Sequence, residues 1–180
     1  MKLSVIIPYM EAFPRKIDIL ERCLNSLVGE DEVLVIENWK EGYAVPINYG
    51  LSQASSDFLL VMNDDIQQIR GDLKDLCDPT AVTTPIEDGQ KAKYIWGNCF
   101  CLPRWVYEKT GGLDERYRIS YFDDDDIIFT LQELGIPMKT VESVEFSNPQ
   151  GGTTLHTFPD HNEFFEENKQ RFLRKWGRLP

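Results

Sequence analysis

Acidic side chains stand at three places in this 180-residue chain where folding could gather carboxylates. They are Glu37, the pair Asp64 and Asp65, and the four consecutive residues Asp123, Asp124, Asp125 and Asp126. Adjacent carboxylates repel each other unless water or a cation lies between them. Mg²⁺ and Mn²⁺ take oxygen ligands and commonly join protein carboxylates to the phosphates of a substrate. The residue types therefore predict a divalent cation site, together with a carboxylate that can act as general base on a hydroxyl.

The same residues also have plainer structural explanations. Asn and Asp are ordinary turn residues, so Asn63, Asp64 and Asp65 could simply end a strand. Helix N-termini favour carboxylates through capping and the helix dipole, which accounts for one or two of the acids in the run 123–126. Four acids in a row exceed that need. Consecutive helical positions point about 100° apart, so only one or two of them can face one cleft.

Other kinds of site are excluded because their motifs are missing. The acidic run is followed by Ile127-Ile128-Phe129, which does not fit the alternating ligands of an EF-hand. The chain contains no G-x-x-x-x-G-K-[ST] phosphate loop, no G-x-G-x-x-G after the first strand and no G-x-S-x-G elbow. A nicotinamide cofactor is therefore not expected. A nucleoside diphosphate held through a divalent cation is the ligand that fits the acids.

Apolar runs and helical spacing predict an α/β fold. In the first third of the chain they indicate a strand at 3–8, a helix at 15–28, a strand at 33–36, a helix at 43–54 and a strand at 58–62. Continuous apolar runs of this kind are typical of strands buried on both faces. The alternation of strand and helix implies parallel pairing, and ligands of such sheets bind beyond the carboxyl ends of the strands. Glu37, Asp64 and Asp65 stand at such ends.

The remaining two thirds of the chain predict a mixture of short strands and helices. The expected elements are a short helix at 69–76, strands at 81–84 and 93–102, a helix that opens at 103 and ends at Gly111-Gly112, a helix at 123–134, a strand at 138–144, a Gly-rich loop at 147–154 and a helix at 162–176. No internal repeat or linker divides the chain. We therefore expect a single domain over residues 1–180.

Composition narrows the classes of partner. The net charge of −11 argues against a surface built to bind nucleic acid or anionic lipid. The apolar run from Leu3 to Ile7 is too short for a signal peptide or a membrane span, so a cytoplasmic protein without such a span is expected. Zinc sites usually need more nearby cysteines or histidines than this chain offers. Buried free thiols are therefore expected at Cys23, Cys77, Cys99 and Cys101.

Short motifs along nearly the whole chain resemble those of family 2 glycosyltransferases with the GT-A fold, and in particular a small rhamnosyltransferase-like member. The matching segments, in chain order, are 4–9 (SVIIPY), 20–27 (LERCLNSL), 33–38 (VLVIEN), 48–50 (NYG), 63–65 (NDD, in place of the DXD motif), 111–117 (GGLDERY), 122–127 (FDDDDI) and 171–177 (RFLRKWG). Each segment alone is weak. Their order and spacing together carry the resemblance.

The resemblance implies a GT-A fold, the fold of nucleotide-diphospho-sugar transferases, with a central, mostly parallel sheet flanked by helices. It implies an inverting, metal-dependent glycosyltransferase of the hexosyltransferase type. Such an enzyme moves a sugar from a nucleoside diphosphate sugar to a hydroxyl of a glycan or glycoconjugate acceptor, with Mn²⁺ or Mg²⁺ as cofactor. Residues 1–65 would form the nucleotide-binding half, and residues 66–180 the acceptor-binding half with the C-terminal helix.

Roles carried over by position follow the same resemblance. Asp65 would bind the metal, Asp64 the ribose or the metal, and Asp124 would be the catalytic base. His156 would match a histidine that some members place on the metal, although a surface or capping histidine explains it as well. The donor nucleotide would lie against Pro8, Tyr9, Glu37 and Asn48. Aromatic faces suit sugar rings, and the residues expected to form an acceptor wall are Trp96, Asn98 and Tyr121.

The chain departs from the family pattern at three acidic positions. Asn63 replaces the first acid of the DXD motif, and Glu37 stands where Asp is usual. Asp123 replaces a Glu, which leaves open whether Asp123 or Asp124 is the base. Two other functions remain possible from the sequence: a nucleotidyltransferase on a related fold, and a non-catalytic protein that binds nucleotide sugars.

Overall fold

A computed structural model describes residues 1–11, 16–38, 42–149, 158 and 160–180 of the chain. Within these ranges seven strands form one sheet in the order β2-β1-β3-β6-β5-β7-β4. The strands are β1 (Leu3–Tyr9), β2 (Glu32–Glu37), β3 (Phe58–Met62), β4 (Gln67–Arg70), β5 (Val82–Glu87), β6 (Cys99–Pro103) and β7 (Met138–Ser147). The helices are α1 (Lys16–Ser26), α2 (Ala44–Gln53), the 3₁₀ helix η1 (Leu73–Leu76), α3 (Arg104–Thr110), α4 (Asp123–Glu133) and α6 (His161–Trp176).

The sheet is mixed but mostly parallel in direction. β1 pairs in parallel with β2 and β3, and β5 pairs in parallel with β7. β6 is antiparallel to both β3 and β5, and β4 is antiparallel to β7. Five strands therefore run one way, while β4 and β6 run the other. The carboxyl ends of β1 and β3 consequently meet at one edge of the sheet.

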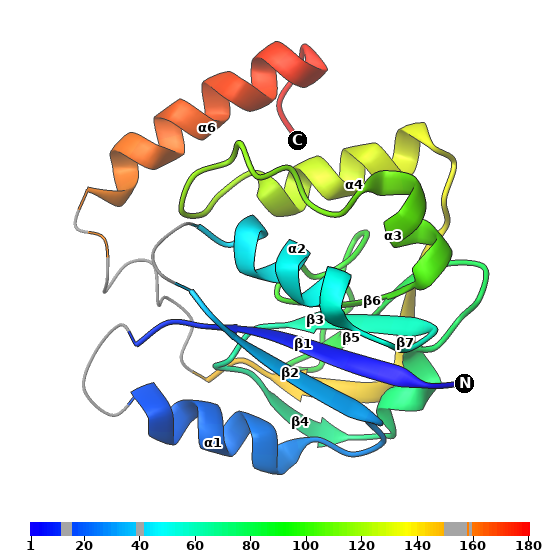
Figure 1. The fold of residues 1–180 in the computed structure, drawn as a ribbon. Coiled ribbons are helices and arrows are strands. Elements are labelled where there is room, and N and C mark those ends of the chain that lie inside the picture. Colours follow the sequence, from blue (N-terminus) through cyan, green and yellow to red (C-terminus); the bar gives the residue numbers. More distant parts are fainter. Residues whose placement is uncertain (12–15, 39–41, 150–157, 159) are drawn as a thin grey trace.

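Helices cover both faces of the sheet (Figure 1). α1 lies on one face, where an apolar core joins it to Leu3, Val5, Ile7, Leu60 and Met62. α2, α3 and α4 lie on the other face, over Ile6, Leu59, Val61 and the apolar residues of β6. Successive side chains of a strand alternate between faces, so β1 and β3 feed both cores, and their prediction as strands buried on both sides is confirmed.

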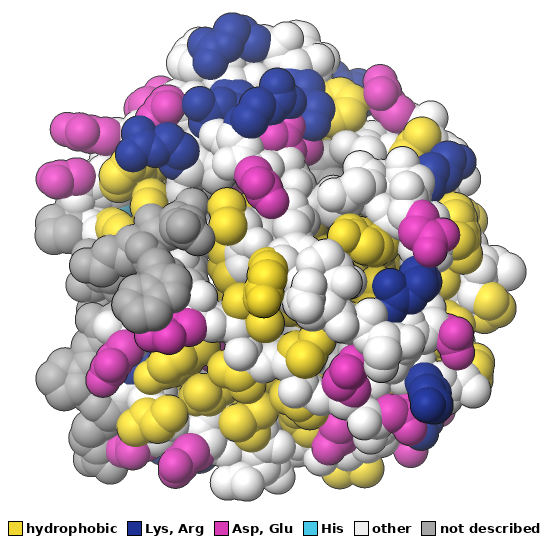
Figure 2. All heavy atoms as spheres, viewed as in Figure 1, with side chains coloured by type: hydrophobic (Ala, Val, Ile, Leu, Met, Phe, Trp, Pro, Cys, Tyr) yellow, Lys and Arg dark blue, Asp and Glu magenta, His cyan; other side chains and the backbone are white. Residues whose placement is uncertain are grey.

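β2 does not match its prediction as a fully buried strand. It lies at the edge of the sheet, so it has one neighbouring strand, and only one of its faces is covered by a helix. Leu34 and Ile36 pack into the core beside α2, whereas Val33 and Val35 are 37% and 40% exposed. Figure 2 shows hydrophobic side chains reaching the surface over α1 and β2. The apolar run at 33–36 thus predicted the strand correctly, but its burial on both faces was predicted wrongly.

Two segments of the second half also differ from expectation. The helix expected at 69–76 is instead the end of β4 followed by η1. Gly71 separates them at a φ of +92°, and a Cβ at this position would lie 2.3 Å from the carbonyl oxygen of Ser143, so only glycine allows this turn. The strand expected at 93–102 begins only at Cys99, because Trp96 and Cys99 close a turn through an isolated bridge.

The C-terminal helix is confirmed: α6 covers 161–176, against the expected 162–176. Phe172 is fully buried and contacts the rings of Phe122 and Phe129. α6 therefore packs on α4 (Figure 1). In the part of the chain that the structure describes, no helix combines the length and the apolar character needed to cross a membrane. The four cysteines are buried free thiols, as predicted.

Gly50 of α2 tests how closely this helix approaches β1. A Cβ on Gly50 would lie 2.4 Å from Cγ2 of Ile6, which is fully buried. We expect Gly50→Val to lower the free energy of unfolding by about 1–3 kcal/mol through overpacking. Urea unfolding measures it. Ser52→Val, at an exposed position of the same helix, should cost less than about 0.5 kcal/mol, and equal losses in the two variants would contradict the close contact.

Candidate active site

A cavity of about 310 Å³ opens at the carboxyl ends of β1 and β3, beside the start of α4. Four carboxylates line it: Asp64, Asp65, Asp123 and Asp124. The acids that follow β3 and the acids that begin α4 are thus brought to one place, although about 60 positions separate them in the chain. The hydrogen bond from the backbone N–H of Asn63 to the carbonyl oxygen of Asn98 (2.8 Å) fixes the end of β3 against the segment before β6.

Asp64 is paired inside the protein. Nζ of Lys16, at the start of α1, lies 2.7 Å from Oδ1 of Asp64, and both side chains are almost completely buried. Burial raises the pKa of Asp64 to about 6, although the ammonium group of Lys16 and its hydrogen bond act to lower it. Lys16 therefore offsets one of the two carboxylate charges at the end of β3. When Asp64 and Asp65 are both ionised, these three groups carry one net negative charge.

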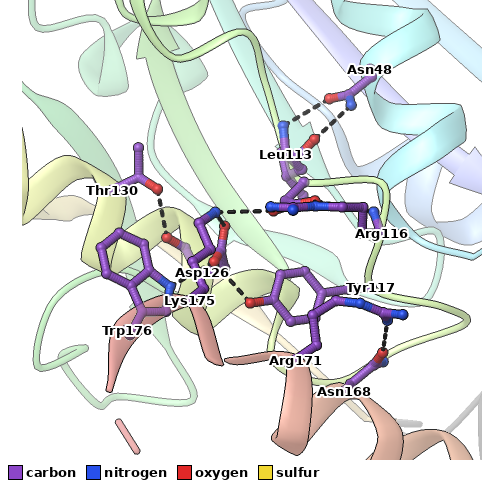
Figure 3. Close-up of polar contacts among 11 residues, drawn as sticks. Asn48, Leu113, Arg116, Tyr117, Asp126, Thr130, Asn168, Arg171, Lys175 and Trp176 are labelled. Carbon is purple, nitrogen blue, oxygen red and sulfur yellow. Dashed lines mark hydrogen bonds and ion pairs between the residues drawn. The ribbon is translucent and has the colours of Figure 1, made fainter. Parts of the chain in front are cut away.

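The four consecutive acids at 123–126 divide between two sides of α4. Asp123 and Asp124 line the cavity. Asp126 points away from it and accepts hydrogen bonds from Tyr117 of the preceding loop and from Lys175 and Trp176 of α6 (Figure 3). This division follows from the turn of about 100° per residue in a helix. Asp126 is 2% exposed and is not part of the cavity lining. Its hydrogen bonds hold neighbouring parts of the structure together.

Burial and mutual repulsion set the protonation of the acids on α4. Asp123 is 5% exposed, and burial, followed by the charge of Asp124, raises its pKa. Burial and Asp124 also raise the pKa of Asp125 to about 6. Asp124 lies directly against Gly97: a Cβ on Gly97 would come 2.4 Å from Cβ of Asp124. Glycine at 97 is therefore what lets the carboxylate of Asp124 reach the cavity.

Tyr43 is a lining residue that the sequence did not reveal. Its hydroxyl donates to the carbonyl oxygen of Gly97 (3.0 Å), just before α2 begins. Burial, followed by the charges of Asp123 and Asp124, raises the pKa of Tyr43 well above its usual value. The neutral phenol therefore persists beside the acids and holds the Gly97 turn against α4.

Amide oxygens complete the polar lining. Oε2 of Glu87 accepts from Nδ2 of Asn98 (2.6 Å), and Oε1 lies 3.4 Å from Nδ2 of Asn148. A carboxylate can only accept, so it turns both NH₂ groups toward itself and both carbonyl oxygens away. Within the described ranges, the buried Oδ1 atoms of Asn63, Asn98 and Asn148 have no hydrogen-bond partner. Buried acceptors of this kind call for a ligand donor, a water or a cation.

These oxygens fit a hard divalent cation. Among the residues that the structure describes, no group of three His, Cys, Asp or Glu side chains forms a complete metal site. Mg²⁺ and Mn²⁺ do not need one, because they are often held by one or two carboxylates while substrate phosphates and water supply the other oxygens. Asp65 and the neighbouring amide oxygens offer such a partial set. His156 lies outside the described residues.

The other residues singled out from the sequence lie as follows. Pro8, Asn98 and Tyr121 line the cavity. Tyr9 points to the opposite face of β1 and packs against the core beside α1. Asn48 is not among the lining residues; it holds the loop before α4, with hydrogen bonds to and from the backbone of Leu113 at 2.8 Å (Figure 3). Glu37 and Trp96 are also absent from the lining.

No protein-family model and no curated protein matches the chain. Solved structures do match it. The catalytic domain of Drosophila β1,4-galactosyltransferase 7, in a complex with xylobiose, is 14% identical and gives a TM-score of 0.66 over 83% of this chain and 71% of its own. GalNAc-T7 with UDP, GalNAc and Mn²⁺ is 13% identical, with a TM-score of 0.65 over 82% of this chain and 43% of its own. S. aureus TarS in complex with UDP is 14% identical, with a TM-score of 0.58 over 82% and 60%.

Likeness at this level of identity establishes the architecture. The chain has the GT-A glycosyltransferase fold, as its motifs predicted. In this fold the cavity lies where α/β sheets place their ligands, beyond the carboxyl ends of the parallel strands.

The raised pKa values predict how stability depends on pH. Asp64 and Asp125 have pKa values of about 6 against an ordinary value of 3.8, so between these values the native state binds more protons than the unfolded state. Their contribution to stability is complete below pH 4 and is lost as the pH rises through about 6. We expect the free energy of unfolding to fall by roughly 2 kcal/mol between pH 4.5 and 7.5, after discounting partly exposed Asp125 for solvent screening.

Urea unfolding at the two pH values measures this difference. Asp125→Asn should make it smaller, because one of the carboxyl groups with a raised pKa is removed. Glu133→Gln, at an exposed position of the same helix, should leave it unchanged. A free energy of unfolding that rises between pH 4.5 and 7.5 would contradict the burial of these acids.

Proposed function

We propose that this protein is a metal-dependent glycosyltransferase that moves a sugar from a nucleoside diphosphate sugar to a hydroxyl of a glycan or glycoconjugate. The observation that carries the proposal is the meeting of Asp65 and Asp124 on one cavity within a GT-A fold. The ligands of the similar structures support it, since GalNAc-T7 holds UDP, GalNAc and Mn²⁺, and TarS holds UDP. Kinship with family 2, rhamnosyl-type specificity and a hexosyltransferase class are part of the proposal on the strength of the motifs alone.

On the donor side, Asp65 would be the protein ligand of Mn²⁺ or Mg²⁺, with His156 as a further candidate. When bound, such a cation would neutralise the negative charge that grows on the leaving diphosphate. Asp64 would contact the ribose or the cation, held in place by Lys16. Pro8 lines the same side of the cavity, while Glu37, at the end of β2, would reach the nucleoside base.

On the acceptor side, Asp124 would accept the proton of the attacking hydroxyl. Direct attack on the face opposite the leaving diphosphate inverts the anomeric centre. Burial, followed by the charge of Asp124, raises the pKa of Asp123, so Asp123 keeps its proton to a higher pH than an ordinary carboxyl and must lose it before it could act as the base. Asn98 and Tyr121 would meet acceptor hydroxyls across the cavity, and Trp96 would lie farther from them. The orphaned oxygen of Asn98 is suited to accept from a hydroxyl.

The two alternatives fit the cavity less well. A protein that only binds nucleotide sugars has no need for a base opposite the cation site, yet Asp123 and Asp124 both reach the lining. A nucleotidyltransferase is not among the similar structures named above.

The assignment of the base is tested with Asp124→Asn. Nδ2 replaces one carboxylate oxygen, so the side chain keeps its size and cannot accept the proton. We expect the rate of transfer, or of donor hydrolysis, to fall about 10²- to 10⁴-fold, with Mn²⁺-dependent UDP affinity retained. A panel of UDP-, GDP- and dTDP-sugars with Mn²⁺, screened by thermal shift, first identifies the donor.

Two matched variants complete this experiment. Asp125→Asn changes the next residue of the acidic run, which does not line the cavity, and should retain most of the activity. Asp65→Ala should abolish both the activity and the metal-dependent part of UDP affinity. Full activity in Asp124→Asn would contradict the assignment of Asp124 as the base. Failure of every nucleotide sugar to bind would contradict the proposed function itself.

A further inference from the structure

The segment just before α4 has an unusual backbone. Ile119, Tyr121 and Phe122 all have positive φ values, 64°, 79° and 68°, in the left-handed region. Residues other than glycine rarely adopt this conformation, and a β-branched residue such as Ile119 does so least readily. Such a conformation persists only where the surrounding structure over-determines it.

This strained segment forms one wall of the cavity. Ile119, Ser120 and Tyr121 line it, and Asp123 and Asp124 follow directly in the chain. The direction in which α4 starts is therefore set by the backbone of 119–122. A change in this loop would move the acids of α4 relative to Asp65, which stands on a different element.

Asn168 of α6 holds the loop in this conformation. Its side chain is fully buried, and Nδ2 donates to the carbonyl oxygens of Arg118 (2.8 Å), Ser120 (2.9 Å) and Tyr121 (3.3 Å). Oδ1 accepts from the backbone N–H of Arg118 (3.1 Å) and from Arg171 (2.9 Å). The one intervening carbonyl, of Ile119, accepts from the backbone N–H of Tyr43 (3.0 Å). All four carbonyl groups from 118 to 121 are thus occupied.

α6 is itself fixed to α4 at the other side of the acidic run. Nζ of Lys175 lies 2.7 Å from Oδ2 of Asp126 and 3.0 Å from Oδ2 of Asp114, and Nε1 of Trp176 lies 2.7 Å from Oδ1 of Asp126 (Figure 3). Phe172, between these residues and Asn168, packs on Phe122. The C-terminal helix therefore holds both the loop before α4 and the outer side of α4.

We propose that Asn168 is a positioning residue of the candidate active site: through the backbone of 118–121 it sets the cavity wall and the placement of the acids on α4. Asn168 does not line the cavity, so it acts only through this loop. The inference rests on the proposed function for its catalytic consequence. Its structural part, that one buried amide holds three left-handed residues, stands independently.

The test is a double-mutant cycle between Asn168→Ala and Ile119→Gly. Asn168→Ala removes the hydrogen bonds that the Asn168 side chain makes to the loop and leaves the one from Tyr43. We expect kcat to fall at least about tenfold because the base is misplaced. UDP affinity with Mn²⁺ should stay within about twofold, since β3 and Lys16 hold Asp64 in place without α6. Glycine adopts positive φ without strain, so in the Ile119→Gly background Asn168→Ala should lower kcat less than about threefold.

A second readout does not require activity. Hydrogen–deuterium exchange of the peptide over residues 117–122 should rise about tenfold or more in Asn168→Ala, with β1 and β3 unchanged. Asn162→Ala, an exposed asparagine on the same helix, is the matched control and should change neither kcat nor exchange. Unchanged exchange at 117–122 would overturn the structural part. Equal losses of kcat in the two backgrounds, or a parallel loss of UDP affinity, would overturn the positioning role.

If no nucleotide sugar supports turnover by the unmodified protein, the proposed function fails, and the exchange measurement still decides whether Asn168 holds the loop. The two failures are therefore distinguishable.

Discussion

Mutual repulsion among neighbouring carboxylates, three of them buried and Asp124 partly exposed, is the constraint on which this structure depends. Asp64, Asp65, Asp123 and Asp124 share one cavity, and an uncompensated buried charge is strongly destabilising. Two features of the structure reduce this repulsion. Lys16 pairs with Asp64, and the raised pKa of Asp123 allows that group to remain protonated where an exposed carboxyl would ionise. In the proposed function, Asp65 would bind the cation and Asp124 would accept the proton.

The acidic run at 123–126 shows how one short segment serves two purposes. Its first two residues reach the cavity, and its last residue anchors the C-terminal helix through Lys175 and Trp176. Helical geometry separates these roles without any intervening residues. The C-terminal helix α6 also contacts the loop that forms the cavity wall, through Asn168. The candidate site and α6 are therefore joined by one network of hydrogen bonds.

The sequence predicted well what local pattern determines. The buried strands β1 and β3, the helices α2, α4 and α6, and the acids at strand ends all follow from apolar runs and helical spacing. Burial of β2 was predicted wrongly, because an apolar run does not reveal whether a strand lies at the edge of a sheet. The 3₁₀ turn after Gly71 depends on a contact with Ser143, which is distant in sequence. Neither the edge position of β2 nor this turn can be predicted from a short stretch of sequence.

Residues whose role depends on a distant partner were missed or misplaced. Lys16 reads as the first residue of an amphipathic helix, and its pairing with Asp64 is set by tertiary contact alone. Tyr43, Glu87 and Asn168 have no motif. Asn48 was recognised in a motif of a glycosyltransferase family, yet its amide is engaged with the backbone of Leu113 and not with the cavity lining. A motif identifies a residue; only the fold shows what it touches.

The most direct test of the central claim is the position of a bound metal. Crystals grown with UDP and Mn²⁺ and measured by anomalous scattering would locate it without assumptions about the donor sugar. We expect one Mn²⁺ at the carboxylate of Asp65, inside the cavity that Asp123 and Asp124 also line. A manganese ion bound elsewhere, or UDP bound in the cavity with no metal beside Asp65, would contradict it.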